Sequence, residues 1–129
     1  MMRLFRLVSR CPSKLLVVVG ASALLATSAP ATAQTSSPAV TYFNSCALLY
    51  NAGKTGEAIA ACDQAIALDP GKADAYFIKA SALFGNGKIG SDGKYVVPQG
   101  TVKALNKYLE LAPDGPHAPD VHAMLDSLK

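Results

Sequence analysis

Apolar residues recur every three or four positions in the segment 57–70, EAIAACDQAIALDP, with Ile59, Cys62 and Ile66 among them. This spacing is typical of an amphipathic helix. Pro70 ends the pattern because proline cannot continue a helix and moves the preceding residue out of the helical conformation. The alanines of the segment are small enough to let another helix pack close to it. We therefore expect half of a helix-turn-helix unit here, with the other half directly upstream.

The pattern of this upstream half returns further along the chain. Three stretches recur at a distance of 34 residues with similar side chains. They are Tyr42-Phe43 with Tyr76-Phe77, residues 47–50 (ALLY) with 81–84 (SALF), and Gly53-Lys54 with Gly87-Lys88. A repeat distance in this range indicates stacked supersecondary units.

The repeat distance changes after Lys88. Pro70 now corresponds to Pro113, 43 residues later, so the second unit holds nine extra residues. They fall within 89–98, where a Ser-Asp-Gly turn signal is followed by a stretch of strand-like composition. This pattern predicts a small hairpin or an ordered loop. We expect Pro98 in the first turn of the helix that follows.

The first residues of the chain carry the features of a secretory signal. Four basic residues and no acidic residue precede an uncharged apolar run at 15–26, and Ala31-Thr32-Ala33 offers a small-x-small cleavage site. The run of 12 residues is short of the ~20 that a stable membrane span requires. We expect a signal peptide over 1–33, cleaved after Ala33. An uncleaved signal that tethers the chain to the membrane is the alternative.

Removal of residues 1–33 changes the charge of the chain. The whole sequence has a formal charge of +3, whereas the 96 residues that remain carry eight lysines and nine acidic residues, a formal charge of −1. This balance argues against nucleic-acid binding, which requires several cations against phosphates. The remaining length suits one small domain. Residues 34–38, QTSSP, read as a short leader.

The repeated pattern resembles the tetratricopeptide repeat (TPR) family. Unit one, residues 39–72, fits the 34-residue consensus without a gap. Its matching residues are Tyr42, Cys46, Leu49, Gly53, Ala58, Ala65 and Pro70. Unit two, residues 73–115, matches at Tyr76, Ala80, Leu83, Gly87 and Pro113. Unit two departs from the family pattern at its insertion and at Thr101 and Tyr108, where the family usually has alanine.

The resemblance implies an all-α domain over 39–129. We expect a right-handed helix-turn-helix repeat array of about 2.5 TPR-like units with five helices. The last helix, within 116–129, is expected to act as a cap, because Val121, Met124, Leu125 and Leu128 lie on one helical face.

The resemblance also places two cysteines opposite each other. Cys46 falls on the first helix of unit one and Cys62 on the second, at positions that face each other inside the helix pair. Paired cysteines are common in exported proteins. We expect a disulfide between them, and two free buried thiols are the alternative.

The first helices of successive TPR units line a concave groove that binds peptides or partner helices. Where some family members have basic and amide residues for a C-terminal carboxylate, this chain has Phe43 and Ala47, so an apolar or aromatic ligand segment fits better. Alternatively, the insertion, the cap helix or the leader covers these aromatic residues. The predicted groove residues are Phe43, Asn44, Ala47, Tyr50, Phe77, Ser81 and Phe84.

No pattern for catalysis, cofactor binding or metal binding emerges from the sequence. His117 and His122 are five residues apart, which separates them by about 140° around a helix, and no other ligand lies near them at metal-site spacing. We read both as surface histidines. The sequence favours an exported, non-enzymatic module or scaffold that binds another protein or peptide, in the periplasm or outside the cell. The alternatives are a self-associating structural subunit and a binder of a small apolar or cell-envelope ligand.

Overall fold

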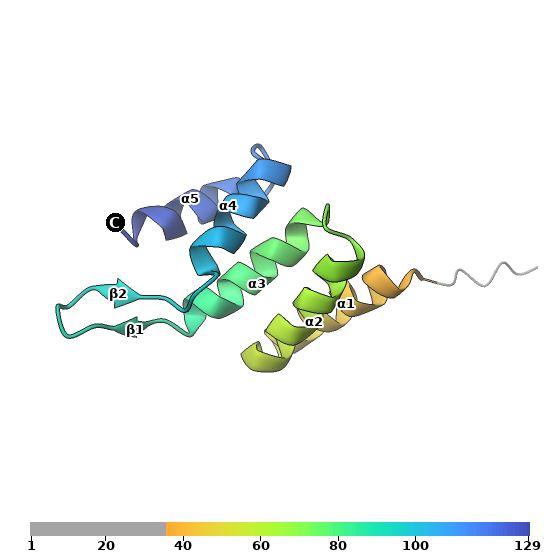
Figure 1. Ribbon diagram of the computed structural model, residues 1–129, viewed down its shortest axis with the longest axis horizontal. Helices are drawn as coiled ribbons and strands as arrows, with labels where there is room; N and C mark the ends of the chain where they lie inside the picture. Colours follow the sequence, from red (N-terminus) through yellow and green to blue (C-terminus); the bar gives the residue numbers. More distant parts are fainter. Residues whose placement is uncertain (1–35) are drawn as a thin grey trace, which may run out of the picture. The chain divides into compact units, whose positions relative to one another are not determined.

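The part of the chain that the structure describes folds into five helices and one short hairpin (Figure 1). The computed structural model describes residues 36–129, so the predicted signal peptide lies outside the described residues. The helices are α1 Pro38–Asn51, α2 Thr55–Leu68, α3 Ala73–Gly85, α4 Thr101–Leu111 and α5 Ala118–Asp126, and the strands are β1 Lys88–Ile89 and β2 Tyr95–Val96. The predicted all-α class with five helices is therefore confirmed.

Helices α1 and α2 form the first pair. Ser37 caps α1 by accepting a hydrogen bond from the backbone N–H of Val40, and Pro38 occupies the first turn, where a missing N–H costs little. Gly53 makes the turn between the helices with a φ of +74°, a conformation that favours glycine. The two helices approach closely because the contacting side chains of α2 are small: Ala58, Cys62 and Ala65 are all buried.

Helix α3 packs between the first pair and α4 and is buried on several sides. Three alanines of this helix, Ala75, Ala80 and Ala82, are fully or almost fully buried. Lys79 of α3 forms an ion pair of 2.5 Å with Asp63 of α2. In the turn between α2 and α3, the Tyr76 hydroxyl donates a hydrogen bond to the carbonyl oxygen of Pro70.

The insertion forms an antiparallel hairpin that extends from the end of α3 (Figure 1). Lys88 pairs with Val96, and Ile89 pairs with Tyr95. The Tyr95 side chain contacts the end of α3, where its hydroxyl donates a hydrogen bond of 2.5 Å to the carbonyl oxygen of Phe84. The hairpin is thereby attached to the end of α3.

Helix α4 begins later than expected. The sequence predicts Pro98 in its first turn, but α4 starts at Thr101. Gly100 precedes the helix with a φ of +89°, which lies outside the right-handed helical region. The carbonyl oxygen of Pro98 accepts a 2.7 Å hydrogen bond from the Thr101 hydroxyl. Pro98 therefore belongs to the turn that precedes the helix.

The main core lies where α3, α4 and α5 meet. Its largest members, Tyr108, Leu105 and Val121, are fully buried. The Tyr108 hydroxyl accepts a 3.0 Å hydrogen bond from the backbone N–H of His117, just before α5. Thr101 and Tyr108 depart from the resembled family pattern, and both side chains are completely buried. The larger side chains at these two positions are therefore part of the core.

Candidate functional site

Helix α1 presents an uncharged and partly exposed apolar surface. None of its 14 residues carries a charge. Val40, Phe43, Ala47 and Tyr50 follow one another at spacings of three and four, which places them within about 80° of the helix circumference. We call these four residues the α1 stripe. Val40 is 41% exposed and Tyr50 37%, and Phe43 and Ala47 are half-buried.

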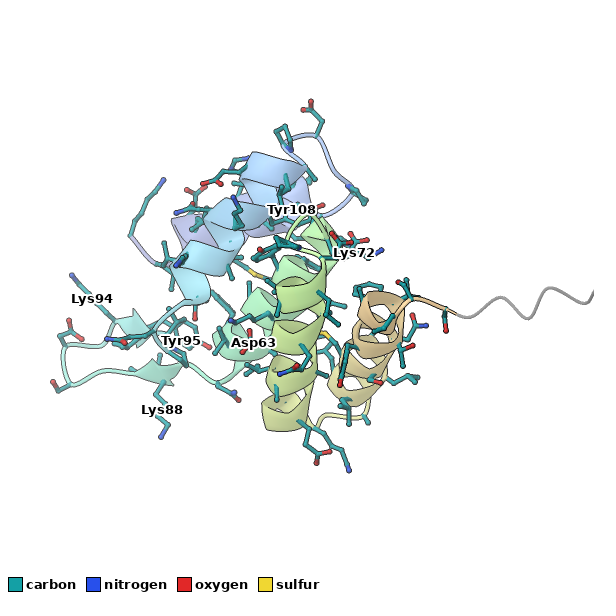
Figure 2. All side chains as sticks on the ribbon, turned by 45° about the vertical axis from the view of Figure 1, so that its right-hand side comes forward. Asp63, Lys72, Lys88, Lys94, Tyr95 and Tyr108 are labelled. Carbon is teal, nitrogen blue, oxygen red and sulfur yellow. A yellow bond between two sulfur atoms is a disulfide. The ribbon has the colours of Figure 1, made fainter. Side chains whose placement is uncertain are left out.

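A lysine from the turn between α2 and α3 lies against this stripe. The Lys72 ammonium group is 4.6 Å from the centre of the Phe43 ring, which is a cation–π geometry. Figure 2 shows Lys72 at the end of the helices where this turn lies. One end of the α1 stripe therefore carries a positive charge, whereas the helix itself is neutral.

The predicted groove residues of α3 have a different environment. Phe77 stacks on the His117 imidazole at 3.9 Å between ring centres with an angle of 4° between planes, and it also contacts Tyr108 at 5.7 Å. Phe84 packs against Tyr95 of the hairpin at 5.1 Å. Both aromatic rings are half-buried beneath residues from the segment before the cap helix or from the insertion.

Ser81 lies between these two aromatic residues on α3. It is 7% exposed, and its hydroxyl oxygen has no hydrogen-bond partner among the residues that the structure describes. Asn44 of α1 is exposed. Of the seven predicted groove residues, the four on α1 are therefore exposed or half-buried, and the three on α3 are half-buried or buried.

Three residues that matter at this surface were not among the predicted site residues. Lys72 lies in the turn between α2 and α3 and Tyr95 in the short strand β2, and no periodic pattern marks either of them. His117 is half-buried in the stack on Phe77, whereas the sequence suggested a surface histidine. The aromatic character of Tyr95 and His117 was visible in the sequence, but the sequence pattern does not show which rings they cover.

The two cysteines of unit one join α1 to α2. The sulfur atoms of Cys46 and Cys62 lie at bonding distance, with 5.0 Å between the Cα atoms, and both residues are fully buried. The predicted pairing therefore agrees with the structure. The bond fixes α1 to α2 and holds the exposed face of α1 in one orientation.

Ionisable groups with shifted pKa values lie away from the stripe. A hydrogen bond and the charge of Glu110 raise the pKa of Lys107 on α4, and Lys129 lowers the pKa of Asp126 in the same way. Within residues 36–129, no group of three or more His, Cys, Asp or Glu side chains is arranged to hold a metal ion. None of the helices in this range has the length and apolarity that crossing a bilayer requires.

Comparison of the chain with models of known protein families gave no match, and a search of curated protein sequences gave none either.

Proposed function

We propose that this chain is an exported, TPR-like module that binds an apolar segment of another protein through the α1 stripe. The observation that carries the proposal is the exposure of Val40 and Tyr50 on a helix without any charged residue. Exposed apolar residues gathered on one face are typical of binding surfaces, whereas isolated ones are ordinary.

The geometry of the stripe suits an extended or helical apolar segment. Aromatic side chains such as Phe43 and Tyr50 are frequent anchors of protein interfaces, because they bury a large area at a small entropic cost. Their spacing of seven residues separates them by about 10 Å along the helix axis. Lys72 at one end favours a partner segment that carries an acidic or aromatic side chain there.

The chemistry of the stripe favours binding over catalysis. Val40, Phe43 and Ala47 have no group that can attack a substrate or transfer a proton. The hydroxyl of Tyr50 is the one polar side-chain group among the four stripe residues. We therefore propose a role in contact and assembly, without a cofactor.

The disulfide supports the exported setting. Disulfides persist in oxidising compartments and are rare in the cytosol. A buried Cys46–Cys62 pair suits the periplasm or the outside of the cell, which agrees with the predicted signal at residues 1–33. We propose export by this signal.

We expect Phe43→Ser and Tyr50→Ser to weaken capture of the partner at least tenfold each, because truncation of an interface anchor typically costs more than ~1.4 kcal/mol. The measurement is quantitative pull-down from the exported fraction of the source cells. Phe77 is unsuitable for this test because its ring packs against the main core.

Leu48→Ser is the matched control, because Leu48 is 70% exposed on α1 but about 120° around the helix from the centre of the stripe. Equal capture by all variants would contradict the proposal. Light scattering of the purified protein separates partner binding from self-association. If the protein is a dimer and Tyr50→Ser converts it to a monomer, the stripe is a self-association surface. Native mass spectrometry with a co-purified small molecule would instead support the ligand-binding alternative.

A further inference from the structure

Positive charge is concentrated in one segment of the domain. Residues 88–107, which form the hairpin and the first part of α4, contain four lysines and one acidic residue, a formal charge of +3. The rest of the described domain contains four lysines and eight acidic residues, a formal charge of −4. The nearly neutral formal charge of the domain is therefore the sum of one basic segment and an acidic remainder.

The same segment exposes aliphatic side chains. Ile89 of β1 is 69% exposed and Val96 of β2 is 56% exposed, and Val102 in the first turn of α4 is also exposed. Each of them lies next to a lysine in the sequence or in the hairpin: Ile89 follows Lys88, Val96 pairs with Lys88, and Val102 precedes Lys103. By the strand register, Lys88 and Val96 share one face of the hairpin, whereas Ile89 and Tyr95 lie on the other. Cationic and exposed aliphatic groups are thus combined on the face of Lys88 and Val96.

The cations of this surface are largely unpaired. Within residues 36–129, Lys88, Lys94 and Lys103 take part in no ion pair, and Figure 2 shows Lys88 and Lys94 pointing away from the helices. Lys107 differs, because its ammonium group lies 2.7 Å from the Glu110 carboxylate. Three of the four lysines are therefore available to an anionic partner.

The hairpin that carries two of these lysines is held in place. Tyr95 fixes it by its hydrogen bond to the carbonyl oxygen of Phe84 and by the contact between the two rings. A Cβ atom at Gly87 would lie 2.5 Å from the Tyr95 ring, so glycine at this position allows the ring to reach α3. The basic and aliphatic side chains are thus presented on a fixed projection (Figure 1).

We propose that the hairpin and the first turns of α4 dock on the surface of a bilayer that contains anionic lipids. Lysines next to exposed aliphatic side chains suit such a surface, because the ammonium groups attract the headgroups while the aliphatic groups enter the boundary of the acyl chains. Nucleic acid fits less well, since Ile89 and Val96 cannot stack on bases and the ring of Tyr95 is engaged by Phe84. The proposal is independent of the α1 stripe.

A single tryptophan can report this contact, because the chain contains none. We expect the emission of Val96→Trp, on the same hairpin face as Lys88, to shift to the blue with vesicles of phosphatidylcholine and phosphatidylglycerol, and not with phosphatidylcholine alone. Leu48→Trp on α1 is the control, since Leu48 is exposed like Val96, and its emission should not move. The signal comes from one position, so any binding through residues 1–33 does not produce it.

The contribution of the lysine charges is tested in the Val96→Trp background. We expect Lys88→Gln with Lys94→Gln to raise the lipid concentration for half-maximal shift about 25-fold, because a lysine near an anionic membrane contributes about a fivefold factor. Lys54→Gln with Lys129→Gln removes the same charge from exposed sites outside the segment and should leave it unchanged. Salt should weaken the binding.

Two results would overturn the proposal. One is the absence of a blue shift at residue 96 with anionic vesicles while circular dichroism shows an intact fold. The other is an equal loss of binding in the two double-lysine variants, which would make net charge alone responsible. A shift with an acidic peptide such as polyglutamate, but not with the vesicles, would assign the surface to an acidic protein partner and would also reject the lipid proposal.

Discussion

Reduction of the Cys46–Cys62 disulfide is expected to lower the free energy of unfolding by about 3 kcal/mol. The bond closes a loop of 17 residues, and opening it returns that amount of conformational entropy to the unfolded chain. Small domains are typically stable by only about 5–15 kcal/mol, so the loss is a large fraction of the total. Equilibrium unfolding in urea, with and without a reducing agent, measures the difference.

The variant Cys46→Ala with Cys62→Ala provides the control. Its stability should not respond to the reducing agent, because no bond remains to be broken. Both cysteines are completely buried, so the wild-type protein must be equilibrated through the unfolding transition before the reagent can reach the bond. Identical transitions of the wild-type protein under both conditions would show that the bond contributes nothing to stability.

Tyr108→Ala is expected to destabilise the domain by about 3–5 kcal/mol, in the range of large aromatic residues removed from a core. Tyr108 is completely buried among α3, α4 and α5, where its ring contacts Phe77. The resembled family usually has alanine at this position. From the family pattern alone, alanine at this position would be expected to be tolerated. The buried packing of Tyr108 instead predicts a large loss in the free energy of unfolding, which thermal or urea unfolding measures.

Two further variants separate the parts of the Tyr108 contribution. Tyr108→Phe keeps the ring and removes the acceptor for the His117 N–H, so we expect a loss of about 1–3 kcal/mol. Val102→Ala on the exposed side of the same helix should change stability by less than about 0.5 kcal/mol. If Tyr108→Ala were as stable as the wild-type protein, the described packing of α4 and α5 would be wrong.

The helices were predictable because their apolar residues recur at helical spacing between clear breaks. Pro70 marks the end of α2, which stops at Leu68, and the glycine at 53 marks the turn before it. The start of α4 was less predictable, since Pro98 suits a helix start equally well as a preceding turn. Only the conformation of Gly100 distinguishes the two cases.

Two glycines that match in the repeated pattern have different structural roles. Gly53 and Gly87 are 34 residues apart and occupy the same place in the repeated pattern. Gly53 adopts a positive φ, whereas Gly87 leaves room for the ring of Tyr95. Glycine is thus required for its backbone conformation in one unit and for its lack of a side chain in the other. The sequence pattern does not distinguish these two reasons.

The predicted groove residues are exposed or half-buried on α1 and half-buried or buried on α3. The resemblance to the TPR family assigned Phe43, Ala47 and Tyr50 to one face of the first helix. It does not show what covers that face, because cover comes from residues distant in the sequence. His117, just before α5, covers Phe77, and Tyr95 of the hairpin covers Phe84. Neither residue belongs to a segment with helical periodicity.

The division between scaffold and surface follows from these contacts. Helix α2 contributes Ala58, Cys62 and Ala65 to the interior, and the disulfide fixes α1 upon it. We infer that α2 positions the stripe without forming part of it. The proposed protein-binding and lipid-binding surfaces lie on different elements, so a loss at one need not affect the other.

Photo-crosslinking in the source cells tests the proposed role of the α1 stripe most directly. A photoreactive phenylalanine derivative in place of Tyr50 preserves an aromatic ring at a position that is exposed in the isolated chain. We expect a crosslink to one defined protein at residue 50 and none at residue 48, on another side of the same helix. Crosslinks that are absent at residue 50, or equally abundant at both positions, would contradict it.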